Sequence, residues 1–267
     1  MPQPIESLDR PVLERRYRRM RLTAVVLGAA SLLLVTALGA QGMSRAPLGS
    51  AADAQPKTSA DANDAASGAD AKTAAQQCPV QDRRDPNDPR GLGSIDAPIV
   101  LHEWTDFRCP YCGAFSRDTL PVLIEEYVKS GKVRLEIHDA ALVGGENSVL
   151  IAAATRAAGE QGLYFEYYDA VYHASVAKQE SRAEFTLEEL VQLASSIGVT
   201  NLSGFREALE TGKFDAAVRA ETAEAQRIGV TGVPFFATTD CGQVTSGAQP
   251  VDSFRAVLDA AIKAAKQ

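Results

Sequence analysis

Two cysteines separated by two residues, Cys109 and Cys112, constrain the fold of this sequence more than any other feature. The apolar run at 99–104 before them is typical of a β-strand, and the spacing of apolar residues over 110–130 predicts a helix. Pro110 fits the first turn of that helix. A strand that passes through such a pair into a helix is the arrangement in which two thiols form a redox couple.

The expected chemistry of the pair follows from its place at a helix N-terminus. Free backbone N–H groups and the helix dipole favour a thiolate on Cys109, and the neighbouring Arg108 adds positive charge. Cys112 lies one turn into the helix and is more shielded. We therefore expect Cys109 to attack a substrate and Cys112 to resolve the mixed disulfide that forms.

The segments after the pair alternate in predicted secondary structure. Residues 133–138 alternate apolar and polar side chains, as a strand with one buried face does. Four helical segments are expected over about 145–229, one of them with a capping box that starts at Thr186. Residues 235–246 predict a hairpin, and Pro250 is expected at the first position of a last helix. This order indicates an α/β fold with a helical insertion.

The N-terminal part of the chain has the pattern of a membrane anchor. Residues 22–40 carry no charge over 19 positions, and a helix of that length nearly spans the hydrocarbon core of a bilayer. Six arginines precede this run: Arg10, Arg15, Arg16, Arg18, Arg19 and Arg21. Their charge predicts a cytoplasmic tail over 1–21, a single pass through the cell membrane, and an extracytoplasmic location for the rest. A signal peptide cleaved at 37–39 is the alternative, although the apolar core of such peptides is usually only about 7 to 15 residues.

Composition separates a stalk from a folded domain. Residues 50–77 contain 11 alanines and four aspartates but no Leu, Ile, Val or aromatic residue, so they lack the apolar side chains that offset the entropy of folding. We expect a disordered Ala/Asp-rich stalk over 41–77 and one folded domain over 78–267. A net charge of -7 and an aromatic content of 6% argue against a nucleic-acid partner, which would require a broad basic face.

A zinc site is the alternative interpretation of the two cysteines. Such a site needs a second pair of Cys or His ligands at short spacing. The three histidines, His102, His138 and His173, show no such spacing to each other or to another ligand. The sequence therefore predicts that the protein binds no metal and that the redox pair needs no cofactor.

Two segments together resemble the DsbA-like branch of the thioredoxin superfamily. They are Trp104-Thr-Asp-Phe-Arg-Cys-Pro-Tyr-Cys112 and Thr231-Gly-Val-Pro234, and the resemblance covers about residues 85–262. It implies a thioredoxin-like fold in which the bond between Val233 and Pro234 is cis and lies next to the cysteine pair. A trans proline at the start of a strand is the alternative.

The resemblance also implies further site residues. Glu103 matches a buried acidic residue beneath the active-site disulfide that is thought to move protons, and strand alternation supports its burial because it shares a face with Leu101. An exposed strand residue is the alternative for Glu103. A substrate is expected to pair with the backbone of Val233, and Pro110 and Tyr111 complete the expected substrate-binding residues.

The predicted function is that of a thiol-disulfide oxidoreductase that forms disulfide bonds in exported, cysteine-containing proteins. By resemblance, a quinone-linked membrane protein of the DsbB-like or vitamin-K-epoxide-reductase-like (VKOR-like) type would reoxidise the pair. Tyr111 replaces the histidine of strongly oxidising members and adds no positive charge, so a disulfide reductase or isomerase stays an alternative. A non-catalytic binding module or chaperone on the same fold is a third possibility.

Cys78 and Cys241 remain after the redox pair is assigned. In an exported domain an unpaired thiol is open to oxidation, so we expect a structural disulfide between these two cysteines. Closing a loop of this length stabilises a fold by up to roughly 5 kcal/mol in chain-entropy terms. Two free thiols, a bond to another molecule, and a pair that exchanges with Cys109 are the alternatives.

Overall fold

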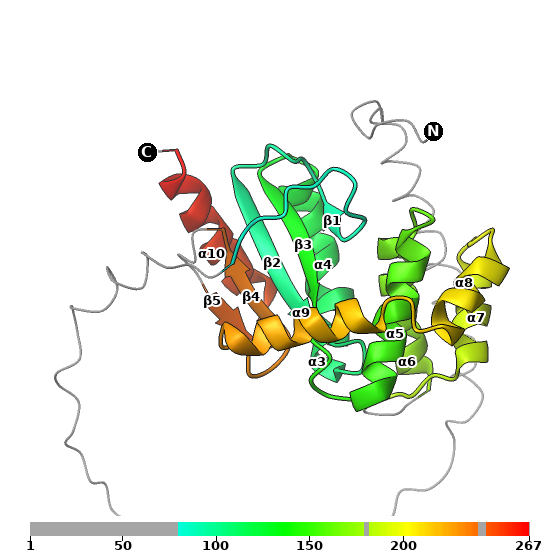
Figure 1. Cartoon of the computed structure of the whole chain (residues 1–267). Helices are drawn as coiled ribbons and strands as arrows, with labels where there is room; N and C mark the ends of the chain where they lie inside the picture. Colours follow the sequence, from blue (N-terminus) through cyan, green and yellow to red (C-terminus); the bar gives the residue numbers. More distant parts are fainter. Residues whose placement is uncertain (1–79, 179–181, 240–243, 267) are drawn as a thin grey trace, which may run out of the picture. The chain divides into compact units, whose positions relative to one another are not determined.

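The computed structural model describes residues 80–178, 182–239 and 244–266 (Figure 1). The expected tail, anchor and stalk over 1–77 lie outside these residues, as do Cys78 and Cys241, so these expectations stay predictions. Within the described part of the chain, no helix combines the length and the apolar character that a membrane crossing requires.

Five strands of the described residues form one mixed sheet, in the order β1-β3-β2-β4-β5. Their bounds are Gly91–Leu92 for β1, Ile99–Thr105 for β2, Val133–Asp139 for β3, Phe235–Thr238 for β4 and Val244–Ser246 for β5. β2 and β3 are parallel, and the other neighbouring pairs are antiparallel. Every residue of the central strand β2 is buried, as expected for a strand that is covered on both faces.

The helix that follows Cys109 runs in four consecutive pieces. They are α3 at Pro110–Ala114, the π-helical turn η3 at Phe115–Thr119, α4 at Leu120–Leu123 and a second π-helical turn, η4, at Ile124–Val128. Pro121 has no N–H to donate to the preceding turn, which explains why the regular hydrogen-bond ladder changes next to it. The helix predicted over 110–130 is therefore present, with two wider turns.

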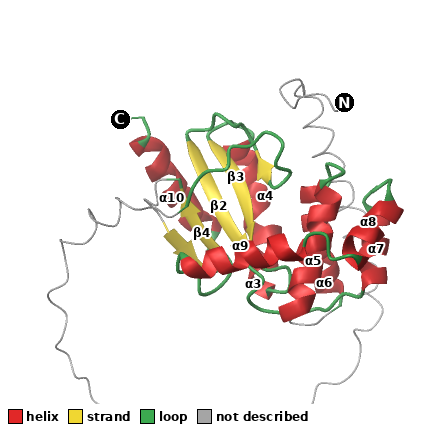
Figure 2. Cartoon of the chain, viewed as in Figure 1, coloured by secondary structure: helices red, strands yellow, loops and turns green. Residues whose placement is uncertain are grey.

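Five helices of the described residues lie between β3 and β4 and form the helical insertion (Figure 2). They are α5 at Gly145–Gly159, α6 at Tyr164–Ala177, α7 at Leu187–Ser196, α8 at Leu202–Glu210 and α9 at Asp215–Arg227. The sequence pattern predicts four segments because it takes glycines as helix ends, and no glycine separates α6 from α7. The expected capping box is present, and Thr186 with Glu189 starts α7 as a separate helix.

Helices cover both faces of the sheet (Figure 2). The last helix, α10 at Val251–Ala264, contacts β2 and α4 on one face, and α9 contacts β3 on the other. Pro250 is the N-cap of α10 rather than its first residue as predicted, because its ψ of 151° is extended. The helix that carries the cysteines thus shares a face of the sheet with α10, opposite α9.

The two faces of the central strands bury different side chains. On the α10 face, Phe236 stands directly opposite Glu103 in the sheet and packs against Phe115 and Phe254. On the α9 face, Trp104 belongs to a small apolar cluster with alanines of α9 and β4. The rings of His102 and His138 lie next to Trp104, and Nδ1 of His138 lies 3.1 Å from a carboxylate oxygen of Glu221. An aromatic core therefore lies under the cysteine helix, and a polar network lies under α9.

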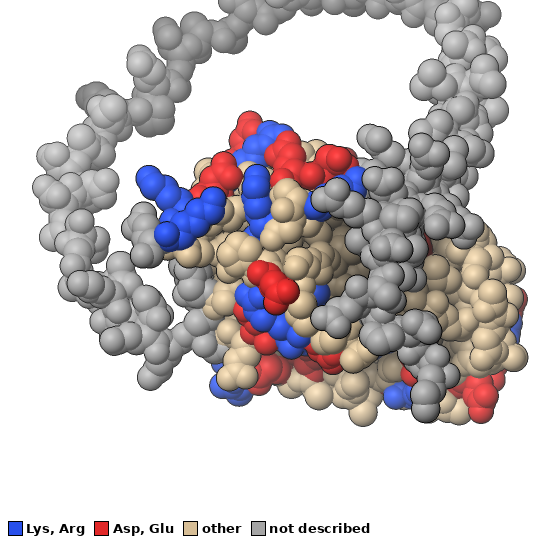
Figure 3. All heavy atoms as spheres, turned by 90° about the horizontal axis from the view of Figure 1, so that it is seen from above, with Lys and Arg blue, Asp and Glu red and all other residues tan. Residues whose placement is uncertain are grey.

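Charged groups of both signs are interspersed on the surface of the described residues. Figure 3 shows one such face, on which Lys and Arg lie next to Asp and Glu rather than in separate fields. Ion pairs such as Arg255–Glu126 and Arg206–Glu188 join different helices. Mixed charge of this kind is typical of a solvated surface.

Candidate active site

The two cysteines lie where β2 leads into α3. Cys109 is the N-cap of α3, with Pro110 at the first helical position, and its backbone N–H donates to the carbonyl of Asp106 at 2.9 Å. Cys112 lies in the first turn of the helix. Both are thiols in this structure, and Cys109 is 5% exposed whereas Cys112 is 0% exposed. An incoming thiol can therefore reach Cys109 first.

The two thiols differ sharply in their tendency to ionise. A hydrogen bond from Cys112 lowers the pKa of Cys109 to about 7, helped by the backbone N–H groups of Cys112 and Tyr111 and opposed by burial. Burial raises the pKa of Cys112 well above its ordinary value, and the hydrogen bond with Cys109 and the negative charge of its thiolate raise it further. The helix N-terminus thus stabilises one thiolate, on Cys109.

The side chain of Arg108 is held by groups other than Cys109. Its guanidinium donates to the carbonyls of Gly144 and Arg182, each at 2.9 Å, and pairs with the carboxylate of Glu184. These contacts hold the side chain against the insertion. The expected positive charge is therefore engaged with other groups, and the nearby Asp106 opposes ionisation of Cys109.

The loop before β4 comes directly alongside Cys109. The Val233–Pro234 peptide bond is cis, as the resemblance implies, and Pro234 is buried. The Cys109 thiol donates a hydrogen bond to the Val233 carbonyl, with a sulfur–oxygen distance of 3.3 Å. The structure therefore brings together Cys109, Val233 and Pro234, which are distant in the sequence.

Glu103 is buried beneath the active-site helix, as strand alternation predicts. The hydroxyl of Tyr168 donates to its Oε1 at 2.9 Å, whereas its Oε2 has no hydrogen-bond partner among the described residues. Burial raises the pKa of this carboxyl to about 8, against the hydrogen bond from Tyr168. Glu103 therefore carries a proton at neutral pH.

Several polar residues next to Glu103 escape a prediction from sequence. The hydroxyl of Thr105 lowers the pKa of both Glu103 and Cys112, so it lies close to the carboxyl and to the buried thiol. It also shares a hydrogen bond of 2.7 Å with Tyr172, whose hydroxyl donates to the carbonyl of Asp106. The tyrosines of α6 are spaced like ordinary core residues, so their hydroxyl partners emerge only when the insertion folds onto β2.

A shallow groove of about 80 Å³ runs beside the sulfur of Cys109. Its walls come from α3 and α6 and from the loop after β2, with Phe107, Tyr172 and Val176 as apolar members. Tyr111 is 66% exposed and Val176 is 52% exposed, which makes them the exposed large apolar side chains of the described residues. Pro110, also exposed, joins Tyr111 next to the reactive sulfur.

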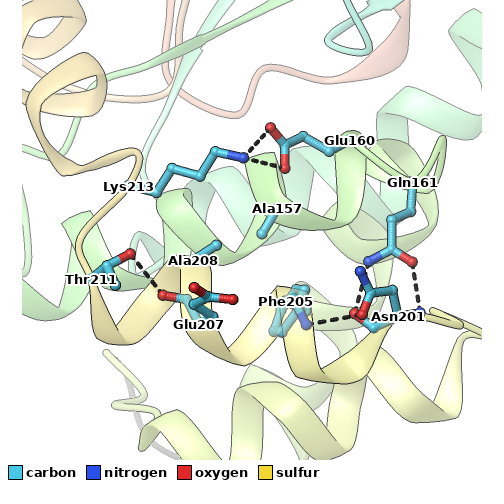
Figure 4. Close-up of a pocket in the computed structure, with 10 residues that line it drawn as sticks. Ala157, Glu160, Gln161, Asn201, Phe205, Glu207, Ala208, Thr211 and Lys213 are labelled. Atoms are coloured by element: carbon cyan, nitrogen blue, oxygen red, sulfur yellow. Dashed lines mark hydrogen bonds and ion pairs between the residues drawn. The ribbon is translucent and has the colours of Figure 1, made fainter.

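A larger cavity of about 430 Å³ lies away from the cysteines, between α5 and α8 (Figure 4). Lys213 pairs with Glu160 at its edge, and Gln161 exchanges two hydrogen bonds with the backbone of Asn201. None of the expected site residues lines this cavity. The smaller groove, by contrast, is lined by Cys109 itself.

Comparison with known proteins shows to which family this chain belongs. A thioredoxin family model matches residues 85–260. The chain belongs to the thioredoxin family. Among its relatives, the probable disulfide bond formation protein D of Bacillus anthracis is 30% identical over 148 residues, which span 54% of this chain and 67% of that protein. The disulfide bond formation protein D of Bacillus subtilis is 21% identical over 152 residues, or 56% of this chain and 67% of that protein.

Solved structures of the thioredoxin family confirm the fold. Oxidised BdbD from Bacillus subtilis superposes with a TM-score of 0.60 at 20% identity, over 66% of this chain and 94% of that one. DsbA from Chlamydia trachomatis gives a TM-score of 0.57 at 19% identity, over 69% and 95%. The chain is a DsbA-like thiol-disulfide oxidoreductase with a thioredoxin-like α/β fold and a helical insertion.

Proposed function

We propose that this chain forms disulfide bonds in exported proteins through Cys109 and Cys112. The opposite shift of the two thiol pKa values, to about 7 for Cys109 and upward for Cys112, supports an exchange-active pair in which Cys109 meets the substrate, whichever way the electrons run. A stable Cys109 thiolate makes Cys109 a good leaving group when a substrate takes the disulfide over. The names of the Bacillus relatives, disulfide bond formation proteins, support the same direction.

The reaction starts from the Cys109–Cys112 disulfide. A substrate thiolate attacks the sulfur of Cys109, a mixed disulfide forms, and Cys112 leaves as a thiolate that takes up a proton. A second substrate thiolate then attacks the substrate sulfur of the mixed disulfide and releases the Cys109 thiolate. The substrate loses two electrons and gains a disulfide, and the cysteine pair gains the two electrons.

We propose that Glu103 supplies the proton that Cys112 takes up. The carboxyl holds a proton at neutral pH because its pKa is raised to about 8, and Thr105 interacts with both Glu103 and Cys112. The transfer runs from Glu103 through the Thr105 hydroxyl to the sulfur of Cys112. During reoxidation the same path returns the proton when Cys112 must become a nucleophile.

Substrate binding is proposed for the groove beside Cys109. Its apolar members and the exposed ring of Tyr111 suit the apolar side chains of a segment that has not yet folded. The backbone of Val233 lies beside the reactive sulfur, where an extended substrate segment can pair with it. Recognition of this kind depends little on the substrate sequence.

Location and partner are proposals that rest on the sequence. Residues 22–40 would anchor the chain in the cell membrane, with 1–21 in the cytoplasm, 41–77 as a stalk and the domain of 78–267 outside. A quinone-linked membrane protein of the DsbB-like or VKOR-like type would reoxidise the pair. Tethering keeps the two partners at a high effective concentration.

A disulfide reductase or isomerase is the second candidate, and one observation favours it. The pKa of about 7 for Cys109 matches the value of roughly 7 in thioredoxin rather than about 3.5 in DsbA. A pair with that thiolate stability can act as a dithiol donor. Tyr111, which adds no positive charge next to the pair, is consistent with this second direction.

Equilibration of the protein with glutathione separates the two candidates. The oxidase proposal predicts a reduction potential between that of DsbA, about -120 mV, and that of protein disulfide isomerase, about -180 mV. A reduced, unfolded protein with two cysteines should then gain a disulfide in proportion to the enzyme added. A potential near that of thioredoxin, about -270 mV, would contradict the oxidase and support the reductase.

A further inference from the structure

Helix α9 lies against one face of the sheet, where it contacts β3 (Figure 1). A second buried polar cluster lies on that face. In the parallel register of β2 and β3, His102 stands opposite Glu136, and Trp104 stands opposite His138. Because side chains alternate along a strand, these four side chains point to the same face. The proposed disulfide chemistry uses none of them.

Three of these side chains bring donor atoms to one point. Nδ1 of His102 lies 3.0 Å from Nε2 of His138 and 3.9 Å from Oε2 of Glu136. One donor atom of each residue lies within 4.8 Å of the other two. Ligand atoms bound to a tetrahedral Zn²⁺ at about 2.0 to 2.1 Å are roughly 3.3 Å apart, so the three atoms need only small shifts to surround an ion.

The outer nitrogens of both histidines face carboxylates. Nε2 of His102 lies 3.1 Å from Oδ1 of Asp82, and Nδ1 of His138 lies 3.1 Å from Oε1 of Glu221. A carboxylate accepts hydrogen bonds, so an imidazole nitrogen that bonds to one carries the proton. The inner nitrogens then both present lone pairs to the same point. Carboxylates behind both imidazoles are the arrangement that orients metal-bound histidines.

In the absence of a metal, a hydrogen bond from Arg83 allows the two histidines to bond to each other. Its Nη1 lies 3.2 Å from Nδ1 of His138, and when it donates there, His138 carries its proton on Nε2 and donates to His102. The same Nη1 lies 3.2 Å from Oε1 of Glu221. Arg83 therefore keeps a partner when the proton of His138 moves to Nδ1. Metal binding requires a change of one tautomer and no large movement.

We propose that His102, Glu136 and His138 form a binding site for a divalent cation that prefers nitrogen ligands, with Zn²⁺ as its representative. Arg134 binds Oε1 of Glu136 at 2.8 Å, and the backbone N–H of Arg83 donates to Oε2 at 2.8 Å, so the site offers two imidazole nitrogens and the second lone pair of Oε2. Ca²⁺ and Mg²⁺ require about six oxygen ligands, whereas this donor set suits Zn²⁺, Ni²⁺ or Cu²⁺. A bound ion would link β2 to β3 and stabilise the fold.

Ligand spacing in the sequence misses this site. The two histidines are 36 positions apart, and only the register of two parallel strands places them side by side. The prediction that the protein binds no metal rests on local spacing alone. His138 is 12% exposed at its side chain, which gives an ion a route to the buried donors.

Tryptophan fluorescence reports on the site directly. Trp104 is the one tryptophan of the chain, and its ring stacks on His138 with the centroids 4.7 Å apart. The full chain is oxidised, its remaining thiols are alkylated so that cysteines hold no metal, and a chelator then removes bound ions. We expect Cu²⁺ or Ni²⁺ to quench the fluorescence. One equivalent of Zn²⁺ should be retained in equilibrium dialysis and raise the melting temperature, whereas Ca²⁺ and Mg²⁺ should do neither.

Histidine variants assign the binding to the cluster. His102→Gln and His138→Gln should abolish Zn²⁺ uptake and quenching, and His173→Gln, a change at a 43% exposed side chain on α6, should leave both intact. If the two buried variants fail to fold, Glu221→Gln decides, because it keeps all three ligands and should weaken Zn²⁺ binding about 10- to 100-fold. The proposal is overturned if the wild type retains no Zn²⁺, if His173→Gln loses it equally, or if Glu221→Gln binds as tightly as the wild type.

Discussion

Glu103 and Glu136 lie on the neighbouring strands β2 and β3, and they point to opposite faces of the sheet. Both side chains are fully buried. Glu103 has one hydrogen-bonded oxygen and a pKa raised to about 8 by burial. Glu136 accepts hydrogen bonds from the Arg134 side chain and from the backbone N–H groups of Arg83 and Arg84, which together lower its pKa despite burial.

The difference shows that the number of partners, not burial alone, decides whether a buried carboxyl is charged. Glu136 is an anion fixed in a network of arginines and histidines, and such a network holds a structure in place. Glu103 keeps a proton at neutral pH, and we propose that it exchanges this proton with Cys112. The α10 face of the sheet therefore carries the proposed exchange site, and the α9 face carries a hydrogen-bonded network of charged and histidine side chains.

The largest expected effect is the loss of disulfide exchange in cysteine variants of the α10 face. Cys109→Ser should have no exchange activity and form no mixed disulfides, because the accessible nucleophile is gone. In Cys112→Ser the Cys109 thiolate can still attack a disulfide of an exported protein and release one substrate thiol, and the mixed disulfide should accumulate because Cys112 is not there to displace the substrate. Thiols of both variants are trapped by acid and then alkylated, and non-reducing gels show how much mixed disulfide each variant carries. Accumulation in Cys109→Ser would reverse the assigned roles.

On the α9 face, Glu136→Gln should destabilise the fold. The substitution leaves the buried guanidinium of Arg134 without its charged partner, which typically costs about 3 to 5 kcal/mol. The exchange rate of the protein that remains folded should be unchanged. Urea unfolding gives the loss of stability, and single-turnover exchange gives the rate. A variant that stays stable but exchanges slowly would contradict the claim that the α9 face contributes to stability and not to exchange.

Glu103→Gln should have the opposite signature. Between pH 4.5 and about 8 the native state holds a proton on Glu103 that the unfolded chain has lost, so the free energy of unfolding falls as pH rises, by up to about 1.4 kcal/mol per pH unit. The Gln variant should lose this slope and be the more stable protein at pH 8. It should also exchange about 10-fold or more slowly near neutral pH, since acid–base catalysis by one group usually contributes about 100-fold or more.

The control for Glu103 is the tyrosine that holds it. Tyr168→Phe removes the hydrogen bond to Oε1 but keeps the ring, so the pKa of Glu103 should rise further and the falling slope of stability should extend to higher pH. Unfolding curves at several pH values compare the two variants. A slope that is the same in the wild type and Glu103→Gln would show that this carboxyl does not titrate as described.

The smallest expected effect concerns the dipeptide between the cysteines. Tyr111→His introduces a group that can carry positive charge beside Cys109, which should lower the pKa of Cys109 further and raise the reduction potential by roughly 30 mV. Tyr111→Phe keeps the ring without the charge and should leave the potential unchanged. Equilibration with glutathione measures both. Equal potentials in all three proteins would show that this position does not control the thiolate.

Local sequence patterns predict the parts of the site that adjoin each other along the chain. The strand, the cysteine pair and the helix start are contiguous, and alternation along β2 places Glu103 on the same face as Leu101, although both faces of this strand are buried. The contact between Cys109 and Val233 spans 124 positions and is expected only through the family resemblance.

Contacts that depend on tertiary packing are not predictable in this way. The spacing of the tyrosines of α6 predicts ordinary core residues, and only the packing of the insertion on the sheet brings the Tyr168 hydroxyl to Glu103. The direction of Arg108 depends on loops of the insertion that offer carbonyl groups. The meeting of His102 and His138 depends on strand register, which a pattern of apolar residues does not determine.

The ionisation of the two thiols tests the central claim most directly. The reduced protein is alkylated with a small reagent across a range of pH, and peptide mapping gives the rate at each cysteine. Cys109 should react with a midpoint at about pH 7, and Cys112 should stay protonated and nearly unreactive at pH 9. Two cysteines that titrate together near the ordinary thiol value of about 8.5, or Cys112 ionising first, would contradict the account.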